Sequence, residues 1–109
     1  MPKEIVIRAA APAESEVLLD VMRRASAEYR GVLKPESSVF VETEAVIAGK
    51  LAAGGGFLAV ENQKPVGCII AELLGDSGYL GRLAVDPACR GRGLARRLML
   101  AGEGFVRER

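Results

Sequence analysis

One stretch of the 109-residue sequence decides its fold: Leu83-Ala84-Val85-Asp86-Pro87-Ala88-Cys89-Arg90-Gly91-Arg92-Gly93-Leu94-Ala95. Its apolar beginning is typical of a strand, and a loop with a proline and two glycines follows. An apolar stripe at helical spacing then begins at Leu94. Because a helix begins with backbone N–H groups that have no carbonyl partner, the stretch predicts a strand, an anion-binding loop and a helix.

The two glycines of this loop, Gly91 and Gly93, remove the Cβ atoms that would hold a phosphate away from the backbone donors. The helix dipole adds about half a positive charge there. Residues 82–109 contain 7 Lys/Arg against 3 Asp/Glu, a net charge of +4, whereas residues 1–81 have a net charge of −3. Five arginines form this cluster: Arg82, Arg90, Arg92, Arg96 and Arg97. Taken alone, the glycines and arginines are equally typical of a tight turn with a solvated basic face.

The rest of the chain is predicted from periodicity and turn residues. Turns at 62–65 and 75–78 separate three strands that form an antiparallel meander. Pro12 suits the first turn of a helix, and Gly54 ends a second helix. The predicted strands are Ile5 to Arg8, Phe57 to Glu61, Val66 to Leu74 and Tyr79 to Val85. The predicted helices are Pro12 to Ala27, Val41 to about residue 53 and Leu94 to Val106, with a loop between Gly31 and Val39.

The decisive stretch resembles motif A of the GNAT N-acetyltransferase superfamily. The core of that motif, Arg/Gln-x-x-Gly-x-Gly/Ala, is met by Arg90, Gly93 and Ala95. The dinucleotide fingerprint fits poorly, because Arg96 stands where its third glycine belongs. The resemblance covers essentially the whole chain and implies an α/β (α+β) fold in one domain, residues 1–109. Its elements run β-α-α-β-β-β-α, with a mixed, mainly antiparallel sheet and helices on both faces.

The resemblance also implies acetyl-coenzyme A as co-substrate. The amides of residues 90–95 hold its pyrophosphate, and the strand end binds the pantetheine arm and, through a bulge, stabilises the oxyanion. Arg96 and Arg97 are either phosphate neighbours or plain helix surface. The implied cofactor residues are Leu83, Ala84, Val85, Arg90, Gly91, Arg92, Gly93, Leu94, Ala95 and Arg96.

The activity implied is acyl-CoA-dependent N-acetyltransfer to a primary amine of a small molecule or peptide. Members of the family usually continue past this helix with further strands and a helix, and a later Tyr often serves as general acid. Because the sequence ends at Arg109, the alternative is a non-catalytic acyl-CoA-binding or interaction module. We also expect the strand Tyr79 to Val85 to lie at a sheet edge and to favour a homo-oligomer.

Glu72 and then Tyr79 are the candidates for the general base. The alternative for Glu72 is an exposed strand residue that alternates with buried Ile70. Cys68 is predicted to pack as a small core hydrophobe. Cys89, in the loop, is interpreted as a spacer residue in preference to a nucleophile, because direct transfer needs no covalent enzyme intermediate.

Composition argues against several other classes of protein. The chain has no His and no CxxC pair, so a metal site is not expected. With no Trp and few aromatic residues, nucleic-acid binding is not expected either. No run approaches the ~18–20 apolar residues of a membrane span, and two unpaired cysteines favour a cytoplasmic protein.

Overall fold

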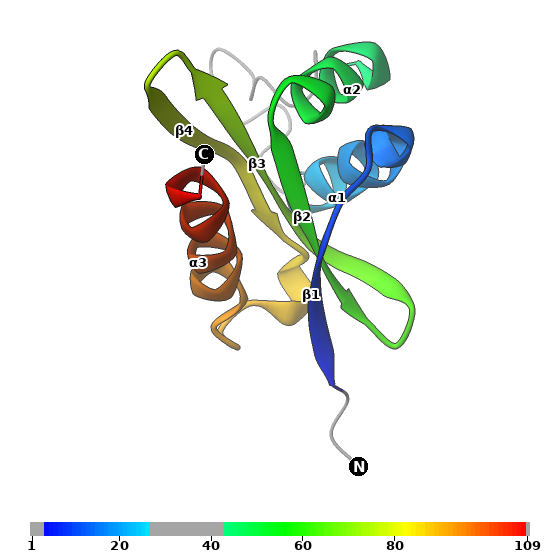
Figure 1. Ribbon diagram of the computed structural model, residues 1–109. Coiled ribbons are helices and arrows are strands. Elements are labelled where there is room, and N and C mark those ends of the chain that lie inside the picture. Colours follow the sequence, from blue (N-terminus) through cyan, green and yellow to red (C-terminus); the bar gives the residue numbers. More distant parts are fainter. Residues whose placement is uncertain (1–3, 27–42, 109) are drawn as a thin grey trace.

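A computed structural model of the chain describes residues 4–26 and 43–108. The strands are β1 (Ile5–Ala9), β2 (Gly55–Glu61), β3 (Lys64–Leu74) and β4 (Ser77–Val85), and the helices are α1 (Ser15–Ser26), α2 (Glu44–Ala53) and α3 (Leu94–Arg107) (Figure 1). Short 3-10 turns lie at Pro12–Glu14 and Pro87–Cys89. The predicted order β-α-α-β-β-β-α is confirmed. The predicted loop between Gly31 and Val39 lies outside the described residues.

The four strands form one sheet in the order β1-β2-β3-β4. Every pairing among these strands is antiparallel, which confirms the predicted meander. Short turns connect β2 to β3 and β3 to β4, so neighbours in the chain are also neighbours in the sheet. Strand β4, the predicted motif strand, therefore lies at one edge of the described sheet, and β1 lies at the other.

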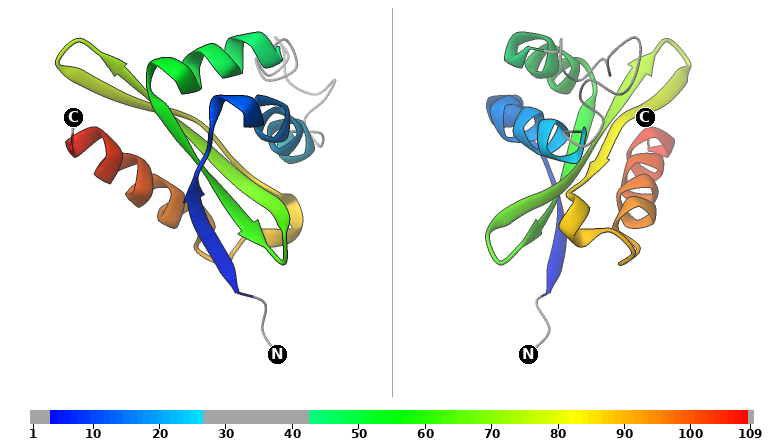
Figure 2. Two further views of the ribbon diagram at one scale, coloured as in Figure 1. Left: turned by 45° about the vertical axis from the view of Figure 1, so that its right-hand side comes forward. Right: turned by 180° about the vertical axis from the view of Figure 1, so that it is seen from behind.

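Helices cover both faces of the sheet, as predicted. Figure 2 shows α1 and α2 on one face and α3 on the other. The alternation of side chains along β3 builds the two halves of the core, because Cys68 and Ile70 pack toward α1 and α2 whereas Ile69 packs toward α3. Leu18, Met22 and Ile47 fill the first half, and Leu94 and Leu98 fill the second. This packing fixes the start of α3 next to the end of β4.

Candidate functional site: a cleft between two helices at the edge of the sheet

Strand β4 contains a β-bulge just before its C-terminal end. The ladder with β3 shifts register between Cys68 and Ile70, so that Arg82 and Leu83 together lie opposite one residue of β3. Arg82 has a φ of 56°, which is uncommon for a residue with a side chain. Its carbonyl accepts a hydrogen bond from the Cys68 thiol at 3.5 Å. Bulges interrupt the ladder and redirect the residues that follow, and this one is where the family resemblance implied it.

The loop after β4 is fixed by Asp86. Its backbone N–H donates to the Val66 carbonyl at 2.8 Å, and its carboxylate accepts the Ala88 N–H at 2.9 Å, which caps the short 3-10 turn. Arg24 of α1 donates to the same carboxylate at 2.6 Å and to the Pro65 carbonyl at 2.9 Å. The Asp86 side chain is only 12% exposed. This ion pair therefore ties α1 to the loop that leads into α3.

The loop then presents an array of free backbone donors. Gly91 and Gly93 have φ values of 82° and 75°, in the left-handed region that favours glycine. Within the described part of the chain, no acceptor is found for the N–H groups of residues 91–96, and the next one, of Arg97, donates to the Gly93 carbonyl at 3.2 Å. Apart from the glycine and its two chain neighbours, no described residue has an atom within 4 Å of where a Cβ of either glycine would be. Successive amides in this conformation form an anion-binding nest at the helix N-terminus.

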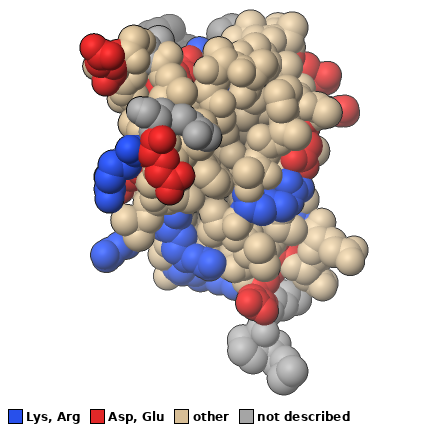
Figure 3. Space-filling model, viewed as in Figure 1, with Lys and Arg blue, Asp and Glu red and all other residues tan. Residues whose placement is uncertain are grey.

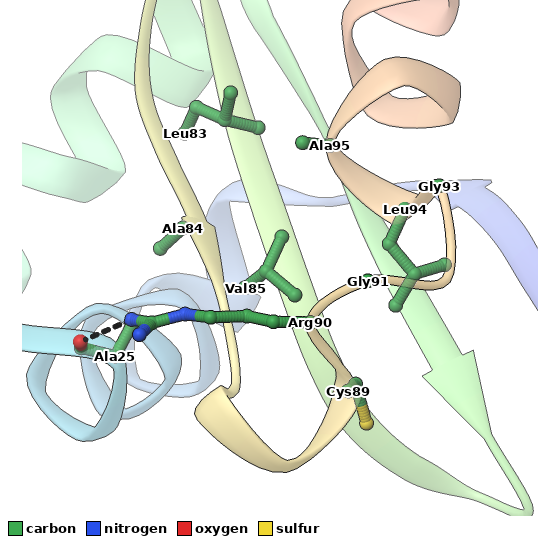
Figure 4. Close-up of a pocket in the computed structure, with 10 residues that line it drawn as sticks. All are labelled: Ala25, Leu83, Ala84, Val85, Cys89, Arg90, Gly91, Gly93, Leu94 and Ala95. Atoms are coloured by element: carbon green, nitrogen blue, oxygen red, sulfur yellow. Dashed lines mark hydrogen bonds between the residues drawn. The ribbon is translucent and has the colours of Figure 1, made fainter.

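A cleft of about 430 Å³ opens beside this array, between the end of α1, the end of β4 and the start of α3. In Figure 4 the side chains of Leu83 and Val85 point toward α3, and Ala84 points toward α1. The Arg90 side chain crosses below them and donates to the Ala25 carbonyl at 3.0 Å, at the last turn of α1. The lining residues are Ala25, Leu83, Ala84, Val85, Cys89, Arg90, Gly91, Gly93, Leu94 and Ala95.

Eight of the ten sequence-predicted cofactor residues line this cleft, and the exceptions are Arg92 and Arg96. Lys and Arg side chains gather on the lower half of the face in Figure 3. Several of them are engaged by protein groups: Arg92 pairs with Glu61 at 2.5 Å, and Arg97 donates to the Ile5 carbonyl at 2.9 Å. Arg96 is exposed on the first turn of α3. Backbone donors, more than arginine side chains, therefore face the space where an anion can bind.

The two candidate catalytic residues lie outside the cleft-lining set. Glu72 and Tyr79 are cross-strand partners on β3 and β4. The Glu72 carboxylate accepts from the Lys50 ammonium of α2 at 2.6 Å and is 26% exposed. Tyr79 is 54% exposed and lies four residues before Leu83, which is about 13 Å along an extended strand. The structure brings the two candidates together, but not beside the bulge.

The cysteines differ in their surroundings. Cys68 is fully buried, and burial raises the pKa of its thiol to about 12, so the prediction of a small core residue is confirmed. Cys89 is also buried, and with Ala25 it belongs to the cleft lining that the sequence reasoning missed. The sequence around Ala25 does not mark it as a site residue, because only the packing of α1 against the sheet brings Ala25 to the cleft. Among the described residues no His, Cys, Asp and Glu side chains cluster in a way that would hold a metal ion.

The family model for the acetyltransferase (GNAT) family matches residues 18–109. No curated protein matched the sequence. Among the described helices, none is long and apolar enough to cross a membrane.

Several solved structures share the fold. PaiA N-acetyltransferase from Thermoplasma acidophilum, in complex with coenzyme A, aligns with a TM-score of 0.80 at 18% identity, over 96% of this chain and 73% of its own. The ribosomal-protein-S18-alanine N-acetyltransferase of Escherichia coli aligns with a TM-score of 0.74 at 20% identity, over 96% of this chain and 61% of its own. A GNAT family acetyltransferase from Brucella melitensis, in complex with acetyl-CoA, aligns with a TM-score of 0.73 at 22% identity, over 96% of this chain and 70% of its own. The chain thus spans between 61% and 73% of the length of these three proteins.

A bulged edge strand, a loop with free backbone N–H groups and the start of a helix together line the cleft of this α/β domain. The chain belongs to the acetyltransferase (GNAT) family.

Proposed function

We propose that the chain binds acetyl-coenzyme A in the cleft and transfers the acetyl group to a primary amine. The observation that supports binding is the run of free N–H groups from Gly91 to Arg96 at the mouth of the cleft. A pyrophosphate offers the several anionic oxygens that such a run requires, and hydrogen bonds to charged acceptors are about twice as strong as neutral ones. Two of the aligned structures are named as complexes with coenzyme A or acetyl-CoA.

The proposal places the pantetheine arm along the edge of β4. Leu83, Ala84 and Val85 line the cleft on that edge, and an amide-containing arm can pair with their backbone as a short strand would. The acetyl carbonyl then lies at the bulge, where a backbone N–H can stabilise the oxyanion. The amine nitrogen attacks the thioester carbon, the C–S bond breaks, the nitrogen loses a proton and the departing thiolate gains one.

Coenzyme A should raise the melting temperature of the folded chain. Ligand that binds only the native state stabilises it by about 2.7 kcal/mol at a hundredfold excess over the dissociation constant, which is several degrees for a domain of this size. Differential scanning calorimetry with coenzyme A measures the shift. Pantetheine, which lacks the pyrophosphate, is the matched ligand and should give a clearly smaller shift. A monodisperse sample with no shift at millimolar coenzyme A would contradict the binding proposal.

A second candidate function, acyl-CoA binding without catalysis, is favoured by one observation. Among the described residues, those that line the cleft include no carboxylate and no tyrosine, and the Glu72 carboxylate is held by Lys50. The two functions differ in whether the 109-residue chain releases free thiol from acetyl-CoA only when an amine is added. A screen of amines, amino acids and peptides with a thiol reagent makes this measurement.

In that assay we expect thiol release to depend on the amine and Glu72→Gln to retain the rate within about threefold, because the carboxylate lies outside the cleft. A general base contributes about 10²–10⁴-fold, so a loss of that size would instead assign Glu72 as the base. If thiol release did not depend on any amine tested, only the second function, acyl-CoA binding without catalysis, would be supported.

A further inference from the structure

We propose that Arg90 is a positioning residue: its side chain fixes the last turn of α1 as a wall of the cleft and is not a ligand of the phosphates. The effect on ligand affinity rests on the proposed function. The attachment of α1 itself does not depend on that function and can be measured without a ligand.

The first observation is the direction of the Arg90 side chain. In Figure 4 it runs from the loop to α1, away from Gly91 and Gly93. Its guanidinium donates to the Ala25 carbonyl at 3.0 Å. The backbone N–H of Arg90 donates to the Pro87 carbonyl at 3.4 Å, so the run of free N–H groups begins at Gly91. Arg90 therefore directs neither its side chain nor its N–H group into the space proposed for the anion.

The acceptor of this bond lies in the last turn of α1, which ends at Ser26. The C-terminal end of a helix carries about half a negative charge, and its last carbonyls have no partner within the helix. A cationic donor at this end is therefore favourable. Arg90 comes from a segment 65 residues away in sequence, so its bond to Ala25 also joins α1 to the loop after β4.

A second contact joins the same two segments in the opposite direction. Arg24, in the same turn of α1, donates to the Asp86 carboxylate at 2.6 Å and to the Pro65 carbonyl at 2.9 Å. The helix thus donates from an arginine to the loop, and the loop donates from Arg90 to the helix. Two contacts at different points restrict the rotation of the helix end as well as its distance from the loop.

The helix end matters because it forms one wall of the cleft. Buried Leu18, Val21 and Met22 fix the body of α1 on the sheet, and Ala25, one turn further along, lines the cleft. The other walls, at the end of β4 and the start of α3, are held by the apolar core beneath α3. We infer that Arg90 helps to set the width of the 430 Å³ cleft.

A displaced wall weakens every ligand that fills the cleft. When only a fraction of the molecules has the wall in the binding position, the apparent dissociation constant rises by the inverse of that fraction. In the proposed function, coenzyme A and pantetheine fill the same part of the cleft, so the factor is the same for both. A phosphate contact would instead stabilise coenzyme A alone, because pantetheine has no phosphate. The two roles of Arg90 therefore differ in which ligand responds.

Isothermal titration calorimetry of Arg90→Met with both ligands separates these roles. Methionine keeps an apolar stem but has no donor and no charge, and because Arg90 is exposed the variant should fold. We expect both dissociation constants to rise by about five- to tenfold, which corresponds to a binding-ready fraction of about 10–20%. Arg90→Lys, which keeps a donor, should recover part of the loss for both ligands. A loss confined to coenzyme A would overturn the proposal and assign the side chain to a phosphate.

Two further arginines on α3 receive the same replacement as controls. Arg96→Met lies on the first turn, beside the free N–H groups, so any loss that it causes should be confined to coenzyme A. Arg107→Met lies at the other end of the helix and should change neither affinity. Equal losses for Arg90→Met and Arg107→Met would show a general effect of charge and would overturn the proposal.

Hydrogen exchange of the ligand-free chain tests the attachment of α1 directly. Amides in the last turn of α1 should exchange about fivefold faster or more in Arg90→Met than in the unaltered chain, whereas those of α3 should not change. Faster exchange in a chain that binds neither ligand would remove the proposed function alone. Coenzyme A binding together with unchanged exchange in α1 would remove this inference alone.

Discussion

Replacing Gly93 by valine should weaken coenzyme A binding by at least about a hundredfold while the chain still folds. Gly93 has a φ of 75°, where a β-branched residue is strained by about 1–3 kcal/mol. Its surroundings are open, so the valine side chain would project into the space beside the free N–H groups. Hydrogen bonds to charged groups contribute about 1.5–3 kcal/mol each, and the loss of two exceeds a factor of one hundred in affinity.

Isothermal titration calorimetry measures this loss, and two variants serve as controls. Gly49→Val in α2 introduces the same side chain at an open position without a positive φ, and should retain affinity. Arg92→Ala removes a side chain that pairs with Glu61 but keeps the backbone donor, so it should cost less than about tenfold. If Arg92→Ala were the more damaging change, the arginine charge and not the backbone array would be the main anchor.

The local elements could be predicted from the sequence because their causes are local. Turn residues separate β2, β3 and β4, and a helical apolar stripe marks α3, so each element lies within a few residues of its prediction. The loop glycines also behave as expected, because a left-handed φ at Gly91 and Gly93 follows from the residue type. The part of the site that consists of backbone could therefore be predicted in place.

The partners of the arginine side chains could not be predicted from the sequence, because they depend on packing between segments that are distant in the chain. The net positive charge of residues 82–109 predicted a ligand site, yet Arg92 is bound by Glu61 and Arg97 by the Ile5 carbonyl. Arg90 reaches Ala25, 65 residues away in sequence. Nothing local marks such pairs, because opposite charges occur throughout the chain.

The pair of Glu72 and Lys50 illustrates the same point. Strand alternation left Glu72 open as an exposed residue or as a base, and neither reading included an ammonium from α2. The bulge at Arg82 has no signal of its own either, since arginine rarely takes a positive φ. Only the resemblance to a family implied a bulge in this strand.

Arg24→Ala should lower the free energy of unfolding by about 2–4 kcal/mol. Arg24 donates to Asp20, to Asp86 and to the Pro65 carbonyl, and the side chain of Asp86 is 12% exposed. Removing one partner of a buried pair costs about 3–5 kcal/mol, and the 30% exposure of Arg24 reduces that value. Urea denaturation measures the change. Arg23→Ala, at an exposed neighbouring position, should stay within about 0.5 kcal/mol.

A double variant can separate two causes of this loss of stability: the unpaired charge of Asp86 and the removal of the Arg24 side chain itself. Asp86 also caps the 3-10 turn by accepting the Ala88 N–H, and an asparagine oxygen can accept that bond without a charge. Arg24→Ala/Asp86→Asn should therefore recover part of the stability, because no buried carboxylate is left unpaired. Since the same pair ties α1 to the loop before α3, Arg24→Ala should also weaken coenzyme A binding in the folded protein. If the double variant were no more stable than Arg24→Ala, the contribution of Arg24 would lie in its bond to the Pro65 carbonyl and in packing, and not in the charge of Asp86.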